Sequence, residues 1–278
     1  MSLMSKLSAT MLISASLFAA TNSEVETFLK KNLSQNPAIV SLDAKVVERT
    51  PLEGMKGWDG FIVQLDAKVK QGKDEQDISQ RVIYFANDKV ITADLTDIKT
   101  GKNLRETMAP KFKAEYYKNS NLISGNANSK HKVAIFSDPL CPFCRSYVPE
   151  ALQYMEKYPE TFAVYYYHLP LERLHPASPT LVRAAVAAEM QGRNVMLDLY
   201  KVPTSITRET NEQKVLDAFN KAVGTNLTVT DLHTPAVDAQ VKSDKAIVDA
   251  LMVGGTPTVY FDGEKDNGKQ RYKEVKVK

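Results

Sequence analysis

The chain has 278 residues, of which 43% are hydrophobic and 25% are charged. That length allows two domains of roughly 100–200 residues each, and the composition is typical of a soluble globular protein. Lys and Arg number 36 against 33 Asp and Glu, so the net charge is only +3. Nucleic-acid-binding tails carry runs of about five or six like charges, and this sequence has none. Charge therefore argues against nucleic acid as a partner.

The first 21 residues have the pattern of a secretory signal peptide. Lys6 supplies a short basic region, the stretch from Ala9 to Ala20 is apolar and uncharged, and acidic residues begin at Glu24. The apolar run is shorter than the roughly 20 residues that a membrane-spanning helix needs. We therefore expect residues 1–21 to be a signal peptide. The alternatives are a buried N-terminal helix and an uncleaved anchor.

Residues 22–100 are predicted to form a small α+β domain. A helix over 24–36 is expected, with Ser23 as its cap and Glu26 completing a capping box. Strands are predicted at 61–69, 82–86 and 90–95, with a turn at 87–89. A domain this small has a marginal core. We therefore expect it to pair with a second copy as a homodimer, the alternative being a monomeric domain packed on its neighbour.

The remainder is predicted to be a linker over 101–124 and a second domain over 125–278. Leu104 to Lys118 is helix-prone, with a kink or break at Pro110. His131–Ser137 contains a continuous apolar run, typical of a strand buried on both faces. Further strands are predicted at 163–167, 258–261 and 272–277, and helices at 145–158, 180–191, 195–199, 212–223 and 244–252. The tyrosines at 165–167 are expected to alternate in burial along their strand.

Cys141 and Cys144 are the only cysteines. A structural disulfide gains most from closing a long loop, and this pair closes almost none, so we interpret it as chemical. If the pair opens a helix, unsatisfied N–H groups and the helix dipole stabilise a Cys141 thiolate. Pro142 suits the first helical position. Cys141 is therefore predicted to attack and Cys144 to resolve the mixed disulfide.

A zinc site is the competing interpretation of the two cysteines. Zinc usually takes four ligands, and the nearest other candidates are His168 and His175. These histidines do not form a second close ligand pair with the usual spacing, so no metal is predicted.

A second motif is Gly254-Gly255-Thr256-Pro257-Thr258, which directly precedes a predicted strand. Proline cannot donate a ladder hydrogen bond and belongs at a strand start or edge. Pro257 is a candidate for a cis peptide bond.

The segments FSDPLCPFC (136–144) and GGTPTVYFDG (254–263) resemble the thioredoxin superfamily, and most closely its dimeric periplasmic DsbC/DsbG branch. The resemblance implies an α+β fold: a C-terminal thioredoxin-like domain with a helical insertion, a small cystatin-like dimerisation domain at the N-terminus, and a linker helix. It implies that Cys141 is the nucleophile, that Cys144 resolves, and that Pro257 is the family's cis-proline. The loop of Thr256 and Pro257 would bind an extended client segment by strand addition.

The resemblance implies a periplasmic enzyme that needs no cofactor beyond the Cys141–Cys144 disulfide. Its substrates would be exported proteins with cysteines, and a membrane protein would maintain its redox state. Thr256 resembles the isomerase-type members, which predicts a disulfide isomerase or reductase with a DsbD-like reductant. The dipeptide Pro142-Phe143, which would tune the redox potential, departs from the branch. Two alternatives therefore stay open: a dithiol oxidase with a DsbB-like oxidant, and a redox-independent holdase chaperone.

Overall fold

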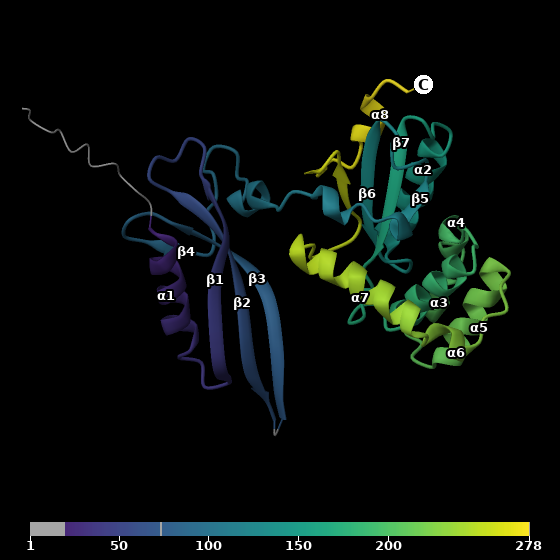
Figure 1. The fold of residues 1–278 in the computed structure, drawn as a ribbon, viewed down its shortest axis with the longest axis horizontal. Coiled ribbons are helices and arrows are strands. Elements are labelled where there is room, and N and C mark those ends of the chain that lie inside the picture. Colours follow the sequence, from purple (N-terminus) through teal and green to yellow (C-terminus); the bar gives the residue numbers. More distant parts are fainter. Residues whose placement is uncertain (1–19, 73, 278) are drawn as a thin grey trace, which may run out of the picture. The chain divides into compact units, whose positions relative to one another are not determined.

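The computed structural model describes residues 20–72 and 74–277, so the predicted signal peptide lies almost wholly outside the described residues. The chain divides into two compact units between Met108 and Ala109. Figure 1 shows an N-terminal unit dominated by long strands and a C-terminal unit of sheet and helices. In the part of the chain that the structure describes, no helix is long and apolar enough to cross a membrane. The two units are described in turn below.

Helix α1 (Asn22–Leu33) opens the N-terminal unit, and its cap differs from the prediction. Thr21, not Ser23, is the cap: its hydroxyl accepts from the N–H of Glu24, whose carboxylate accepts from the N–H of Thr21. The predicted partner Glu26 instead accepts from the N–H of Val46 in the neighbouring strand. The sequence analysis therefore predicted a capping box at the start of this helix correctly, but assigned it to residues two positions too late in the chain.

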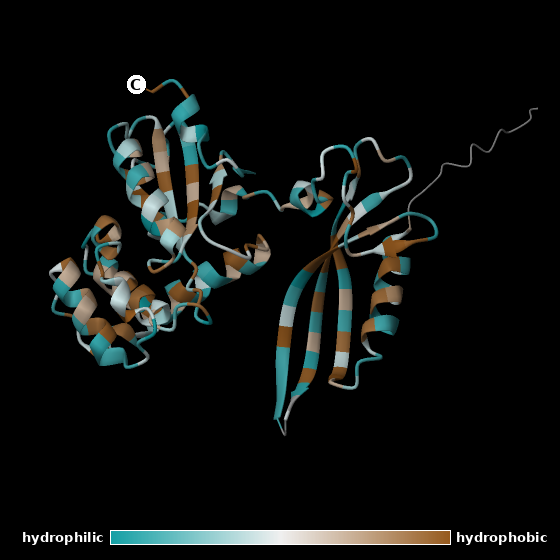
Figure 2. Cartoon of the chain, turned by 180° about the vertical axis from the view of Figure 1, so that it is seen from behind, coloured by the Kyte–Doolittle hydropathy of each residue, from teal (hydrophilic) through white to brown (hydrophobic). Residues whose placement is uncertain are grey.

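The sheet of this unit is antiparallel, in the order β1-β2-β3-β4. Its strands are β1 (Ile39–Pro51), β2 (Asp59–Gln71), β3 (Asp74–Ala86) and the short β4 (Ile91–Thr92). The predicted strands at 61–69 and 82–86 lie within β2 and β3, and β1 was not predicted. Apolar and polar residues alternate along the long strands (Figure 2). This alternation brings Phe61, Val63 and Leu65 against Val25 and Leu29 of α1, forming a small core.

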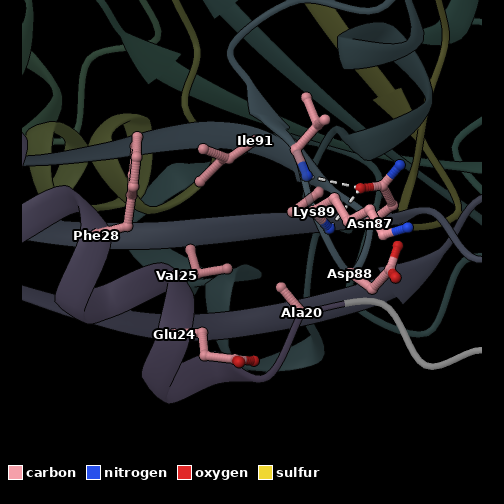
Figure 3. A pocket seen from close by; sticks show the side chains of 10 residues that line it. Ala20, Glu24, Val25, Phe28, Asn87, Asp88, Lys89 and Ile91 are labelled. Carbon is pink, nitrogen blue, oxygen red and sulfur yellow. Dashed lines mark hydrogen bonds between the residues drawn. The ribbon is translucent and has the colours of Figure 1, made fainter.

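The turn between β3 and β4 forms a hollow with the first turns of α1. The side chain of Asn87 accepts from the N–H groups of Lys89 and Val90, which fixes the turn predicted at 87–89. Figure 3 shows Val25 and Phe28 of α1 on one side of this hollow and the turn on the other. The hollow has a volume of about 180 Å³ and contains neither cysteine.

The predicted linker helix is wrong. Over Leu104–Lys118 the chain makes isolated 3₁₀ turns at Leu104–Met108 and Ala114–Tyr116, and a third follows at Asn119–Asn121. Pro110 lies between the first two, where a missing N–H prevents a continuous helix. Phe112 is buried in the C-terminal unit, packed against five other aromatic rings. The segment therefore crosses the boundary between the units as extended chain and turns.

The C-terminal unit contains a five-stranded sheet in the order β5-β7-β6-β8-β9. The central pair, β6 (His131–Ser137) and β7 (Phe162–His168), is parallel, and the other pairs are antiparallel. The remaining strands are β5 (Leu122–Ser124), β8 (Thr258–Phe261) and β9 (Glu264–Lys265). β6 and β8 have the predicted bounds, because short apolar runs between polar flanks are typical of buried central strands.

The tyrosines of β7 are all buried, contrary to the predicted alternation. Their side chains do alternate between the faces of the sheet, but both faces are covered. Tyr165 and Tyr167 pack in one cluster with Phe112 and Ile247, whereas Tyr166 packs in the other cluster with Cys144. A strand buried on both faces carries large residues on each.

Helices cover both faces of this sheet. They are α2 (Pro142–Met155), α3 (Ser178–Met190), α4 (Met196–Leu199), α5 (Glu212–Val223), α6 (Val229–Leu232), α7 (Pro235–Ala250) and α8 (Arg271–Glu274). Figure 1 shows α3 to α6 gathered as one helical group. In the chain this group follows β7 and precedes α7, and it is the predicted insertion. The strand predicted over 272–277 is wrong, because that segment begins within α8.

Candidate active site

Cys141 lies at the N-cap of α2, the position predicted for the nucleophile. Its backbone is extended, and Pro142 is the first residue in the helix. No side chain caps this helix end, so the first N–H groups of α2 lack a side-chain acceptor. The positive end of the helix therefore lies beside the Cys141 sulfur, where it stabilises a thiolate. Cys141 is only 5% exposed.

The predicted Thr256–Pro257 loop adjoins this sulfur. The Sγ atom of Cys141 lies 3.6 Å from the carbonyl oxygen of Thr256. The peptide bond between Thr256 and Pro257 is cis, as the sequence suggested. The structure thus brings together two motifs that are 115 residues apart.

Cys144 is completely buried one turn into α2. Burial raises the pKa of its thiol to about 11, mainly by desolvating the thiolate. The neighbouring Ser137 side chain and the Asp138 backbone lower this pKa, while the charge of Cys141 raises it. Cys144 is thus the less exposed of the two cysteines.

Phe143 separates the two cysteines and points into solvent, with 76% of its surface exposed. The neighbouring Pro142 is exposed as well. An apolar ring offers no hydrogen bond to either sulfur. The side chains of Pro142 and Phe143 therefore donate no hydrogen bond to a Cys141 thiolate. Only the N-terminus of the helix and backbone groups can stabilise it.

Asp138 is a residue that the sequence analysis missed. Its carboxylate is fully buried and accepts four hydrogen bonds. One oxygen accepts from the Leu140 N–H and the Ser178 hydroxyl, and the other from the Leu171 N–H and His175 Nδ1. These contacts join the loop before Cys141 to the segment after β7 and to the start of α3. The only sequence signal was an Asp-Pro pair directly after a buried strand.

The histidines weighed as zinc ligands do not lie with the cysteines. His175 is bonded to Asp138, and His168 is buried at the end of β7, where desolvation lowers its pKa to about 4. Within residues 20–72 and 74–277, no three side chains of the His, Cys, Asp or Glu type cluster as a metal ion would require. The geometry of the pair instead suits thiol–disulfide exchange, in which one sulfur attacks and its neighbour resolves.

Residues 118–277 match the thioredoxin family model. Among curated proteins, the Na⁺/H⁺ antiporter NhaA 1 of Mycolicibacterium gilvum is 22% identical over 152 residues, which cover 52% of this chain and 24% of the antiporter. The antiporter NhaA 1 of Mycobacterium sp. (strain KMS) matches with the same identity and coverage. The chain thus spans about a quarter of the length of these relatives.

Solved structures match a little more than half of the chain. A thioredoxin-like oxidoreductase from Silicibacter pomeroyi DSS-3 is 23% identical, with 57% of this chain and 99% of that one covered and a TM-score of 0.43. DsbA2 of Pseudomonas aeruginosa is 18% identical, with coverages of 56% and 92% and a TM-score of 0.40. The family match spans more than half of the chain and includes the cysteine pair and the Thr256–Pro257 loop. The chain therefore belongs to the thioredoxin family.

Proposed function

We propose that this chain is an exported, periplasmic disulfide isomerase or reductase acting on other exported proteins. The observation that carries the proposal is the asymmetry of the pair. Cys141 occupies the helix end beside the Thr256 carbonyl, whereas Cys144 is buried behind it with a raised pKa. A reductive attack needs one reactive thiolate and a second thiol held in reserve, and this arrangement supplies both.

The exchange proceeds in two steps. The Cys141 thiolate attacks one sulfur of a client disulfide, so that a Cys141–client bond forms and the other client sulfur leaves as a thiolate, which takes a proton. In reduction, Cys144 then loses its proton and attacks Cys141, the client is released as a thiol, and the pair is oxidised. In isomerisation, a different client thiolate attacks its own mixed-disulfide sulfur and frees Cys141 unchanged.

Clients would bind along the Thr256–Pro257 loop. The Thr256 carbonyl adjoins the attacking sulfur, and backbone groups at this position can pair with an extended client segment. The exposed Phe143 ring adds apolar surface beside the pair. Unfolded or misoxidised chains expose both extended backbone and apolar side chains, which fits this surface.

The N-terminal unit supports a homodimer within this proposal. Beyond the end of α1, the sheet has a hollow of about 220 Å³ lined mainly by apolar residues, among them Leu42, Leu65 and Ile78. In the described sheet β1 is an edge strand, and an open edge can pair with another chain. A second copy covering this surface would present two active sites to one client.

Oxidation is the second candidate function, because the dipeptide Pro142–Phe143 departs from the isomerase dipeptide. Its exposed ring gives the thiolate no hydrogen bond, so the backbone and the helix end set the redox potential. A dithiol oxidase would receive electrons from clients and pass them to a DsbB-like membrane oxidant. An isomerase would instead be kept reduced by a DsbD-like protein. A reduction potential well below that of thioredoxin, about −270 mV, would exclude the oxidase role.

The resting redox state of the pair in intact cells decides between these directions. Acid quenching followed by alkylation with a mass-tagged maleimide reports the fraction of reduced Cys141 and Cys144. Mostly reduced protein is expected for an isomerase or reductase. Mostly oxidised protein would mean an oxidase. In parallel, Cys141→Ala should abolish the refolding of scrambled ribonuclease, and retained activity would contradict the isomerase proposal.

A further inference from the structure

The turn that leads from β6 into Cys141 (residues 138–141, the Cys141 turn) is held by hydrogen bonds at each of its residues. The backbone carbonyl of Asp138 accepts from the Cys141 N–H at 3.2 Å, and its carboxylate accepts from the Leu140 N–H at 2.7 Å. The carbonyl of Pro139 accepts from the Arg145 guanidinium at 3.1 Å. Asp138 therefore contacts the backbone of the nucleophile directly and closes the turn before it.

The same carboxylate reaches the start of the helical insertion. Its Oδ1 also accepts from the Ser178 hydroxyl at 2.7 Å, and its Oδ2 accepts from the Leu171 N–H at 2.7 Å and from His175 Nδ1 at 3.0 Å. Ser178 opens α3, and the other two residues lie between β7 and α3. Backbone bonds from His175 to Leu171 and from Ser178 to His175 fold these donors into one compact segment. The Asp138 side chain therefore joins the insertion to the Cys141 turn.

His175 differs from the other three donors to this carboxylate. Leu140 and Leu171 donate from the backbone, and Ser178 donates a neutral hydroxyl. An ionised carboxylate only accepts hydrogen bonds, so Nδ1 of His175 carries the hydrogen in this contact. The carboxylate is completely buried, whereas the His175 side chain is 12% exposed. His175 is thus the side chain through which this buried contact meets the surface.

Two effects of the same sign connect this contact with the Cys141 sulfur. A carboxylate three residues before the sulfur opposes a thiolate, and each hydrogen bond that the carboxylate accepts weakens this repulsion. The turn also sets where the sulfur lies, beside the N-terminus of α2 and 3.6 Å from the Thr256 carbonyl oxygen. A turn that loosens moves the sulfur away from the helix N–H groups that stabilise its thiolate.

We propose that His175 is a positioning residue for the exchange reaction, acting through the Asp138 carboxylate on the turn that carries Cys141. The inference rests on the proposed function in that Cys141 is taken as the attacking sulfur. It goes beyond that function because it assigns part of the control of the nucleophile to the helical insertion. No bond is made or broken at His175, and no proton has to leave it.

The test replaces His175 and measures two properties of the cysteines in the full chain. One is the reduction potential of the pair, from equilibration with glutathione. The other is the pH dependence of Cys141 alkylation by iodoacetamide in a Cys144→Ser background. His175→Ala should make the potential more negative by about 15 mV or more, which is a threefold change in the equilibrium constant. The midpoint of the alkylation profile should rise by about half a pH unit, the same threefold change.

Two amide variants separate the hydrogen bond from the bulk of the ring. The amide nitrogen of asparagine can occupy the place of Nδ1, whereas that of glutamine lies nearer the place of Nε2. His175→Asn should therefore recover at least half of both shifts. His175→Gln should behave like His175→Ala, and it provides the comparison with a polar side chain of similar size if the alanine variant folds poorly.

Two control variants address the general consequences of a substitution. His233 forms another histidine–carboxylate pair in the same unit, with Nε2 2.8 Å from Glu212 at the start of α5. His233→Ala should leave both measured properties unchanged. Val223 is 7% exposed on α5, and Val223→Ala should lower stability in urea denaturation without changing either property.

Three results would overturn the inference: unchanged values in His175→Ala and His175→Gln, equal shifts in either control, or no recovery in His175→Asn. Failure of the proposed function gives a different result. If the wild type forms no mixed disulfide with oxidised glutathione, the exchange itself is rejected. The alkylation profile needs no exchange and still reports whether His175 acts on Cys141.

Discussion

The sulfur of Cys141 lies 3.6 Å from the carbonyl oxygen of Thr256, which places the N-terminus of α2 against the loop that begins β8. A negative charge on this sulfur faces a carbonyl dipole on one side and the positive end of a helix on the other. The helix end favours the thiolate and the carbonyl opposes it. The redox potential of the pair depends on this balance, and a small change beside the sulfur should alter it.

Phe143→His is such a change. Phe143 is 76% exposed, so an imidazole can replace the ring without repacking the core. A histidine beside the pair can donate a hydrogen bond to the Cys141 thiolate, which stabilises the reduced form. We expect the reduction potential to become less negative by about 30 mV or more, measured by equilibration with glutathione. Phe143→Leu, which adds no donor, should leave the potential near that of the wild type, and an equal change in both variants would contradict the argument.

Asp138→Ala should destabilise the C-terminal unit. The substitution leaves the N–H groups of Leu140 and Leu171 and the Ser178 hydroxyl buried without their acceptor. We expect the free energy of unfolding to fall by about 3 kcal/mol or more in urea denaturation. Asp217→Asn, at an exposed carboxylate of α5, is the control and should change it by less than about 0.5 kcal/mol. Similar losses in both variants would mean that the Asp138 contacts contribute little.

His168 should make folding depend on pH. Burial lowers its pKa to about 4, against about 6.5 in an unfolded chain, so between these values the unfolded state binds more protons. The contribution of His168 to stability is therefore present above pH 6.5 and is lost as the pH falls towards 4. The contribution of nearby Asp244 to stability changes with pH in the opposite direction. Burial raises the pKa of this carboxyl to about 6, so its protonation favours the folded state in acid.

The comparison with His168→Phe isolates the histidine from Asp244. The free energy of unfolding of the wild type, minus that of the variant, should fall by up to about 3 kcal/mol between pH 6.5 and pH 4. Urea denaturation at several pH values measures it. A difference that does not change with pH would show that His168 titrates normally in the folded state.

Gly125→Ala should strongly destabilise the chain. Gly125 has a φ of +73°, in the left-handed region, and an added Cβ would overlap the carbonyl oxygen of Phe162. We expect a loss of at least about 2 kcal/mol in thermal or urea unfolding. Gly254→Ala is the control, because its φ is not in that region and no atom lies within 4 Å of an added Cβ. A loss below that of the control would contradict the close approach at Gly125.

The sequence predicted the elements whose signals are local. β6 and β8 have the expected bounds because each is a short apolar run between polar flanks. α5 also has the expected bounds, because Asn211 caps its N-terminus and Gly224 caps its C-terminus. β1 was missed because register shifts at Val40 and Val47 interrupt its alternation. The linker helix, expected with a kink or break at Pro110, is wrong because the residues on either side of the proline form only short 3₁₀ turns.

The residues of the candidate site also fall into two groups, those that the sequence predicted and those that it did not. Cys141, Cys144 and the Thr256–Pro257 loop carry short motifs that can be read from the chain. Asp138 carries only an Asp-Pro pair, since three of its four hydrogen-bond partners lie 33 or more residues away in sequence. Two of the four hydrogen bonds that Asp138 accepts come from backbone N–H groups, which residue types do not reveal. Such contacts follow only from the folded arrangement of β6, β7 and the segments after them.

The most direct test of the account is to trap the mixed disulfide. Cys144→Ser removes the resolving thiol and leaves Cys141 as the only cysteine, so an attacked client should remain attached. The reduced variant is incubated with a scrambled multi-disulfide protein, and non-reducing gels and mass spectrometry measure the adduct. The account predicts a covalent complex through Cys141 that dithiothreitol dissolves and that Cys141→Ser does not form. Absence of any adduct with Cys144→Ser, or an equal yield with Cys141→Ser, would contradict the assignment of Cys141 as the nucleophile.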